Sequence, residues 1–354
     1  MSAFEDHSGK INSQLFRGVL KPYCGRRRSE VITGPQFGVD TSVIQLENDH
    51  ALAVSSDPLS LIPSLGLKES AWLSVHLTAN DIATTGFVPH FAQFVLNLPV
   101  DLLLEQFEEY WKHIHTFCDE TGIAITGGHT GQAPGQESTV PGGATMFVEA
   151  PADQIITADG AEPGDIIVVT KESALVSSSI LAMSFPETVS GELGEKLHRQ
   201  GCENFWRTSV LREALAATEC LSPCTELKAM HDVTEGGLLG AIAEMAEASG
   251  CGFTVDSDKL PVGEAPLAIT ELFGIDYRFC AGAGSMIMAV RKGSEDKLIG
   301  HLRGHSIPAT AVGKFESVED GQTIIEEGVE QPFDYDGEDP YWNAFFNAME
   351  KGWK

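Results

Sequence analysis

Four aspartates stand beside small residues at the ends of apolar segments, a pattern that suits the binding of divalent cations. They are Asp40 in FGVDTSV, Asp57 in VSSDPLS, Asp81 in TANDIA and Asp232 in MHDVTEGG. Magnesium prefers a few carboxylates, keeps part of its water shell and bridges to substrate phosphates. These aspartates are therefore candidate ligands for magnesium beside a phosphate-bearing molecule, with ordinary turn and cap roles as the alternative.

Simpler roles are open to some of these acids. Asp57 can begin a turn before the proline that follows it, and Asp232 can cap the next helix. Asp81 is different, because apolar residues recur at helical spacing through residues 75–82. Within a helix, the short side chains of Asn80 and Asp81 have no propensity reason to be present. We therefore expect a functional role for this pair.

Two Gly-Gly motifs are candidates for close contact with a ligand. GGHT at 127–130 follows an apolar run, which predicts a tight turn at Gly127 and Gly128 whose backbone approaches a ligand; a plain turn is the alternative. In HDVTEGG, Gly236 begins a helix whose free N–H groups favour an anion. The chain has no G-x-x-x-x-G-K-S/T motif and no G-x-G-x-x-G after a strand, which excludes a P-loop and argues against a Rossmann dinucleotide site.

The charge distribution limits how a phosphate can be bound. The formal net charge is -28, which argues against nucleic acid or an anionic membrane as a partner. Between residues 29 and 170 the only basic side chains are Lys68 and Lys112. A phosphate-rich ligand in this half of the chain must therefore be held by backbone N–H groups or by metal ions on carboxylates.

Apolar segments of strand and helix type alternate in two halves, which predicts an α+β protein with two domains. We expect a flexible arm over residues 1–30, a first domain over 31–155, a second over 160–330 and an aromatic helix within 331–354. In the first half, strands at 91–98 and 143–150 flank a long amphipathic helix that ends at Gly122. The aromatic stripe near the C-terminus can pack on the protein's own core or on a partner.

The seven cysteines lack the spacing of a disulfide framework, and no apolar run is long enough to span a membrane. The first residues lack the layout of a secretion signal. We therefore expect a cytoplasmic protein. The pair Cys220 and Cys224 lacks zinc-site spacing, and Cys24 has the character of an incidental thiol.

Taken in order, these motifs resemble the aminoimidazole-ribonucleotide-synthetase-like (AIR synthase-like) superfamily of ATP-binding proteins. The superfamily includes the purine-pathway cyclo-ligase, the HypE-type hydrogenase-maturation dehydratase, selenophosphate synthetase and thiamine-phosphate kinase. GVDTSVI is similar to its acidic G-D-D-A-A-V segment, with Val39 in place of the first acid. SSDPLS, TANDIATTGFVP and HDVTEGGL are similar to its T-T-D-S, N-D-x-A-x-x-G-x-x-P and H-D-x-T-x-G-G-L segments.

The resemblance implies a two-domain chain whose first domain forms a shared β-barrel in a homodimer, with a C-terminal α/β domain. It implies that ATP lies in a groove and that Mg²⁺ ions on the aspartates hold its phosphates. It also implies catalytic roles for Asn80, Asp81 and His129, with Asn80 facing the phosphates. The implied nucleotide contacts are Asp40, Asp57, Asn80, Asp81, Gly127, Gly128, Asp232 and Gly236.

The layout is nearest the HypE type, with two departures. That type carries a C-terminal cysteine and an acid and a lysine in G-D-T-K, whereas this chain ends in MEKGWK and has GGHTG, with His129 and Gly131. GGHT instead resembles selenophosphate synthetase, but that enzyme's N-terminal G-C-x-C-K loop is missing. The leading hypothesis is a Mg-ATP-dependent enzyme that activates a small or protein-carried acceptor by phosphoryl transfer. The alternatives are a nucleotide-binding regulatory protein without turnover and a maturation partner that docks another protein.

Overall fold

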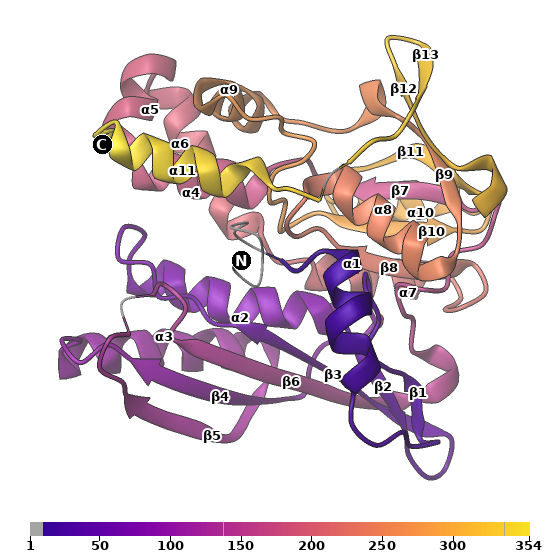
Figure 1. Ribbon diagram of the computed structural model, residues 1–354, viewed down its shortest axis with the longest axis horizontal. Helices are drawn as coiled ribbons and strands as arrows, with labels where there is room; N and C mark the ends of the chain where they lie inside the picture. Colours follow the sequence, from indigo (N-terminus) through magenta and orange to yellow (C-terminus); the bar gives the residue numbers. More distant parts are fainter. Residues whose placement is uncertain (1–9, 137, 336) are drawn as a thin grey trace.

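The computed structural model describes residues 10–136, 138–335 and 337–354, and it contains two β-sheets that helices cover (Figure 1). The first sheet has the strand order β1-β2-β3-β6-β4-β5. Its neighbouring strands are antiparallel except for β4 and β5, which are parallel. The strands are β1 (Val31–Thr33), β2 (Ser42–Gln45), β3 (His50–Pro58), β4 (Phe91–Leu98), β5 (Ala124–Gln132) and β6 (Gly142–Pro151).

One face of this sheet is buried under two helices, α2 (Leu67–Ala83) and α3 (Leu104–Thr121). Along β4 buried and exposed residues alternate, as expected for a strand with one covered face. Phe94 and Leu96 point toward the helices, whereas Phe91 and Val95 are about 40% exposed on the opposite face. The uncovered face of the first sheet is therefore partly apolar.

The second sheet has the strand order β13-β12-β9-β11-β7-β10-β8. Only β9 and β12 are parallel neighbours. The strands are β7 (Ile166–Thr170), β8 (Leu227–Asp232), β9 (Gly252–Asp256), β10 (Met286–Val290), β11 (Ala309–Glu316), β12 (Gln322–Glu326) and β13 (Val329–Pro332).

Helices pack on both faces of the second sheet. Ile287 and Ala289 belong to the cluster that contains the apolar side of α8 (Gly237–Ser249), whereas Met286 and Met288 belong to the cluster that contains α7 (Leu211–Cys220) and α10 (Glu295–Gly304). This second cluster continues into the core of the first sheet. The two halves therefore share buried apolar surface.

The remaining helices form a third cluster against the end of the second sheet. The C-terminal helix α11 packs its aromatic side chains on this cluster, with the rings of Phe345 and Phe185 5.3 Å apart. The other helices of this region are α4 (Leu175–Ser184), α5 (Pro186–Leu193), α6 (Glu195–Asn204) and α9 (Glu264–Phe273), and α11 spans Pro340–Glu350. In the described part of the chain, no helix is both long and apolar enough to cross a membrane.

The described part of the N-terminal arm lies against helix α8 (Figure 1). It contains a short helix, α1 (Ser13–Leu15), followed by further helical turns up to Tyr23. The Lys10 ammonium lies 2.7 Å from Glu244, and the Ser13 hydroxyl donates to Glu247. These contacts bring the arm next to strand β8, which carries Asp232.

Candidate functional site

The structure brings together the aspartates that the sequence singles out. Asp57 lies near the end of β3, Asp81 in the last turns of α2 and Asp232 at the end of β8, and all three line one cavity. Asp40 lies just before β2, and its carboxylate is within 4.8 Å of ligand atoms of His231 and Asp232. Three separate elements of the first half and one strand of the second therefore converge on one place.

Asp232 is buried, the other three aspartates are half-buried, and the carboxyl groups repel one another. Burial, together with the charges of Asp40 and Asp57, raises the pKa of Asp232 to about 8. Burial, with Glu235 and Asp40, raises the pKa of Asp57 to about 7. Burial, with the charges of Asp57, Asp232 and Asp40, also raises the pKa of Asp81 well above its usual value, although the Ser55 hydroxyl donates to it at 2.6 Å.

The cluster has the properties of a cation site. Asp232 is 1% exposed, and its Oδ1 is a buried oxygen without a hydrogen-bond partner among the described residues. An unsatisfied buried carboxylate oxygen is costly unless a cation or donor reaches it. Oxygen ligands from several aspartates are those that Mg²⁺ prefers. The residues present therefore fit Mg²⁺.

A chain of charged side chains connects this cluster to the arm, and no local sequence pattern indicates it. The His231 ring lies between Asp40, 2.6 Å from Nδ1, and Glu244, 3.1 Å from Nε2. Burial alone would lower the pKa of His231, but the two carboxylates outweigh it and raise the pKa to about 10. Glu244 in turn binds Lys10. The contact with His231 therefore fixes the position of the Asp40 carboxylate.

Asn80 does not face the cluster, which corrects the prediction for this residue. It is fully buried, and its side-chain amide donates to the Thr208 carbonyl at 2.9 Å and accepts from the Val210 N–H at 2.9 Å. Both of these bonds go to a loop of the second half. Asn80 and Asp81 lie on different sides of α2, because adjacent helical residues do not share a face. Asn80 therefore positions a loop.

The Gly236 N–H, which the sequence predicts to bind an anion of the ligand, already donates to a carboxylate of the protein itself. It donates to the Asp339 carboxylate at 3.0 Å, at the N-terminus of α8. A carboxylate is favoured at this end of a helix. Burial raises the pKa of Asp339 to about 6, although backbone N–H groups, including that of Gly236, oppose the shift.

The GGHT segment is part of a strand, so the prediction of a tight turn is wrong. β5 runs through it, and a Cβ at Gly128 would lie 1.8 Å from the Phe94 carbonyl oxygen. Gly128 accommodates the close approach of β4, beside an irregular register between the two strands. Pairing runs from Asp57 through Ala144 and Phe94 to Gly128, three strand spacings or roughly 14 Å. Within one chain, Gly127, Gly128 and exposed His129 lie away from the cluster.

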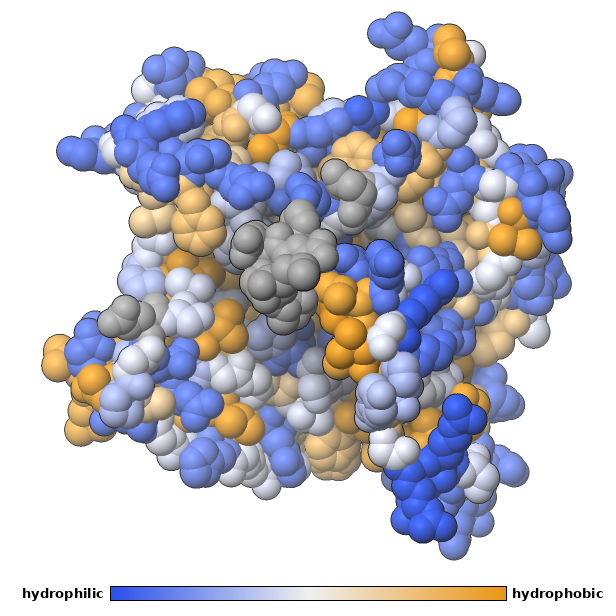
Figure 2. Space-filling view, viewed as in Figure 1, coloured by the Kyte–Doolittle hydropathy of each residue, from blue (hydrophilic) through white to orange (hydrophobic). Residues whose placement is uncertain are grey.

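The carboxylates open onto a mostly apolar cavity of about 210 Å³. Its walls come from α2, α4 and α11, and they include Leu77, Ile180 and Trp342. The indole Nε1 of Trp342 is buried and has no partner among the described residues. In Figure 2 the molecule is hollowed between the lobe of α2 and the lobe of α11, with apolar side chains near the hollow. We call this space the apolar cavity.

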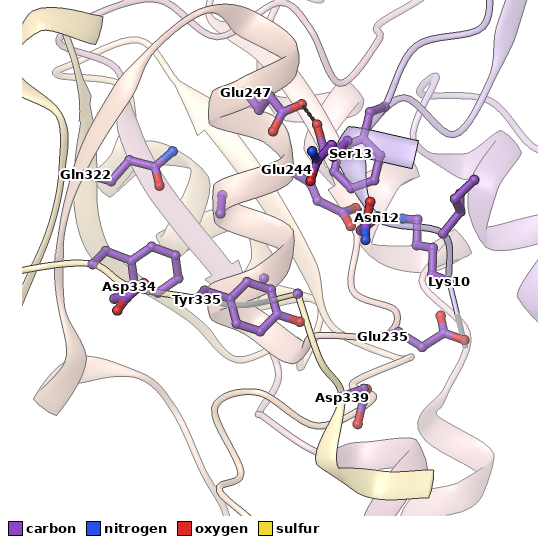
Figure 3. A pocket seen from close by; sticks show the side chains of 17 residues that line it. Lys10, Asn12, Ser13, Glu235, Glu244, Glu247, Gln322, Asp334, Tyr335 and Asp339 are labelled. Atoms are coloured by element: carbon purple, nitrogen blue, oxygen red, sulfur yellow. Dashed lines mark hydrogen bonds and ion pairs between the residues drawn. The ribbon is translucent and has the colours of Figure 1, made fainter. Parts of the chain in front are cut away.

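A second cavity, of about 410 Å³, lies between the arm and α8 (Figure 3). In the figure, Lys10 and Ser13 of the arm face the acids of α8, and Tyr335 and Asp339 approach from the C-terminal segment. Glu235 lines both this cavity and the apolar cavity. The two cavities therefore meet at Glu235, and only the apolar cavity is lined by aspartates of the cluster.

The raised pKa values predict a pH dependence of stability in the metal-free protein. An acid whose pKa is raised on folding binds more protons in the folded state, so its stabilising effect is complete below the unfolded pKa and is lost as pH rises through the folded value. For Asp57 and Asp232 this window runs from about pH 4 to about 8. The raised pKa of His231 acts in the same direction above neutral pH.

We therefore expect the melting temperature in a chelator to fall by ~5 °C or more between about pH 5 and 8, at ~2–4 °C per kcal/mol. Thermal scans at each pH measure this, and Mg²⁺ should restore the loss at the alkaline end. Asp232→Asn should flatten the profile. A flat wild-type profile would show that the carboxylates ionise without cost and are not packed together.

The chain matches the two sequence-family models of AIR synthase related proteins. The family model of the N-terminal domain matches residues 38–148, and the family model of the C-terminal domain matches residues 162–326. A putative hydrogenase expression/formation protein from Methanocaldococcus jannaschii is 27% identical over 248 residues, which is 68% of this chain and 67% of that protein. The thiamine-monophosphate kinase of Salmonella typhimurium is 24% identical over 345 residues, 91% of this chain and 97% of that one.

Among solved structures, the hydrogenase maturation protein HypE in complex with ATP is similar at a TM-score of 0.68 and 20% identity, over 84% of this chain and 89% of that one. This likeness confirms the predicted two-domain α+β fold. The shared β-barrel and the homodimer stay predictions.

Proposed function

The chain belongs to the AIR synthase related protein family, and from that premise we propose that it is a cytoplasmic, Mg-ATP-dependent enzyme that activates an acceptor by phosphoryl transfer. The observation that carries the proposal is the cluster of Asp40, Asp57, Asp81 and Asp232 with an unsatisfied oxygen beside a cavity. When such neighbouring acids are ionised they repel one another, and counter-charge removes this cost. Cations that also bind a triphosphate supply that charge.

Two relatives support this assignment. A HypE protein has been solved with ATP, and a thiamine-monophosphate kinase matches this chain along most of its length. The scarcity of basic side chains between residues 29 and 170 also favours phosphate binding through metal. When bound, Mg²⁺ would neutralise phosphate charge and align the reacting groups.

The residues of the chain itself have separable roles in this proposal. Asp40, Asp57, Asp81 and Asp232 would hold the cations, and the His231 ring, 2.6 Å from Asp40, fixes the orientation of that carboxylate. The apolar cavity is the candidate acceptor site, because three of these carboxylates stand at its wall. Its apolar walls limit water, which would otherwise compete with the acceptor. The unpaired Nε1 of Trp342 would donate to a polar atom of the acceptor.

The uncovered face of the first sheet supports a homodimer. Phe91 and Val95 of β4 are exposed there. Apolar side chains grouped on one face mark an interaction surface. In such a dimer, β5 would lie near the interface, because it is the neighbour of β4. We propose that Gly127, Gly128 and His129 of β5 contact the nucleotide only when this dimer forms.

A nucleotide-binding regulatory protein without turnover is the second candidate. It is favoured by the placement of His129 on an edge strand and by the lack of an acid in GGHTG, where the HypE type carries one. This candidate requires the same metal site and differs only in the absence of product.

Incubation with Mg-ATP and a metabolite extract, followed by mass spectrometry, tests the proposal. We expect ADP to accumulate together with one compound that gains a phosphate or loses water. Neither product should appear with Asp81→Asn. If ATP binds but no ADP or phosphate appears with any fraction of the extract, the regulatory candidate replaces the enzyme.

A further inference from the structure

A second group of possible metal ligands lies at helices α7 and α10, and it shares no residue with the carboxylate cluster. It contains Glu219 near the end of α7, His301 on α10 and His305 directly after α10. One ligand atom of each lies within 4.8 Å of the others. We propose that Glu219, His301 and His305 bind a divalent transition metal ion of the zinc class.

The contacts of these side chains leave room for an ion. His301 Nε2 is buried without a hydrogen-bond partner among the described residues, and it lies 4.0 Å from Glu219 Oε2, which is too long for a hydrogen bond. Tetrahedral zinc with ligands at ~2.0–2.2 Å places the ligand atoms about 3.3 Å apart. Small rotations of Glu219 and His305 close this difference, and both are exposed and free to turn.

The ligand types select the class of metal. Imidazole nitrogens suit zinc, copper, nickel and cobalt, whereas magnesium prefers oxygen ligands only. His301 and His305 are four residues apart, which places two ring nitrogens on one side of the chain as in helical zinc motifs. The rings are already adjacent, with centroids 4.7 Å apart. Three protein ligands leave a position for water or an added group.

The helices that carry these ligands already contact each other, so the ion would bind a prearranged site. Arg212 of α7 donates to the His305 carbonyl at 3.2 Å, and Lys297 of α10 donates to the Cys220 carbonyl at 2.8 Å. A bound ion would add a link between α7 and α10. Because it binds the folded state preferentially, it should stabilise the protein against heat.

Titration with Co²⁺ and Zn²⁺ in excess Mg²⁺ tests the proposal, with the absorption of bound Co²⁺ reporting the ligand set. The titrated protein, called the parent below, carries Asp232→Asn, so that the carboxylate cluster binds added metal more weakly. We expect one equivalent to bind and the double variant His301→Ala/His305→Ala to lose affinity by ~10-fold or more. His305→Gln alone, at an exposed position, should lose affinity in a chain that folds normally.

The matched control is His113→Ala/His115→Ala, which removes two histidines of α3 that are two residues apart and do not share a helix face. This control should bind Co²⁺ as the parent does, and Zn²⁺ should raise the melting temperature of the parent and the control but not of the His301/His305 variant. Equal affinity in the parent and the His301/His305 variant would overturn the proposal. That result would leave the ATP site untouched, since the two sites share no residue.

Discussion

Replacing Asp81 with asparagine should weaken Mg²⁺-dependent ATP binding by ~30-fold or more, because loss of a buried charged partner costs about 2–5 kcal/mol. The substitution keeps the shape of the side chain and its bond from the Ser55 hydroxyl. What it removes is a negative charge beside Asp57 and Asp232. Calorimetric titration of Mg-ATP into the variant measures the change.

The metal-free variant should unfold at a higher temperature than the wild type at about pH 8. Asp81→Asn relieves repulsion among buried carboxyl groups, so a weaker ligand is expected together with a more stable fold. Asp165→Asn is the matched control, since Asp165 is also buried with a raised pKa caused by burial but lies outside the cluster. If Asp81→Asn and Asp165→Asn both bind Mg-ATP with the wild-type affinity, Asp81 is not a ligand in the ATP site.

Replacing Asn80 with alanine should lower the free energy of unfolding by about 2–5 kcal/mol, since each buried backbone group left without a partner costs about 1–3 kcal/mol. The two groups are the Thr208 carbonyl and the Val210 N–H. They belong to the loop that leads into α7, and Lys171 holds the same loop through the Ser209 carbonyl. Chemical denaturation with and without Mg-ATP measures the loss.

Asn80→Asp is the matched variant, because an ionised aspartate can still accept from the Val210 N–H but cannot donate to the Thr208 carbonyl. It should lose roughly half or more of the stability that Asn80→Ala loses. At temperatures where the variants are folded, both should bind Mg-ATP. Normal stability with lost ATP binding would contradict the positioning role and restore the phosphate-facing role that the family resemblance implies.

The parts of the fold that the sequence predicts are those in which local pattern and tertiary structure agree. The strand predicted at 91–98 coincides with β4, and the amphipathic helix ends at Gly122, which has a φ of +78°. The short acid within α2 correctly marks the cluster, because neither helix propensity nor capping explains Asp81. The same reasoning does not hold for Asn80, since its partners lie more than 120 residues away.

The remaining parts of the site depend on contacts that no local pattern encodes. Glu244 lies on a helix with an apolar stripe, and its partner Lys10 is 234 residues away in a segment expected to be flexible. Gly128 is needed in the sheet because a Cβ there would clash with the backbone of β4. A Gly-Gly pair in a tight turn looks the same in the sequence. Gly236 begins a helix, as predicted, but the structure supplies Asp339 as the anion.

Diffraction from crystals grown with Mn²⁺ and a non-hydrolysable ATP analogue is the most direct measurement of how this protein holds a triphosphate. Anomalous peaks should appear between the carboxylates of Asp40, Asp57, Asp81 and Asp232, with phosphate oxygens completing the coordination of each ion. An ordered triphosphate held by backbone or basic side chains, with no anomalous peak at these four carboxylates, would contradict metal-mediated binding.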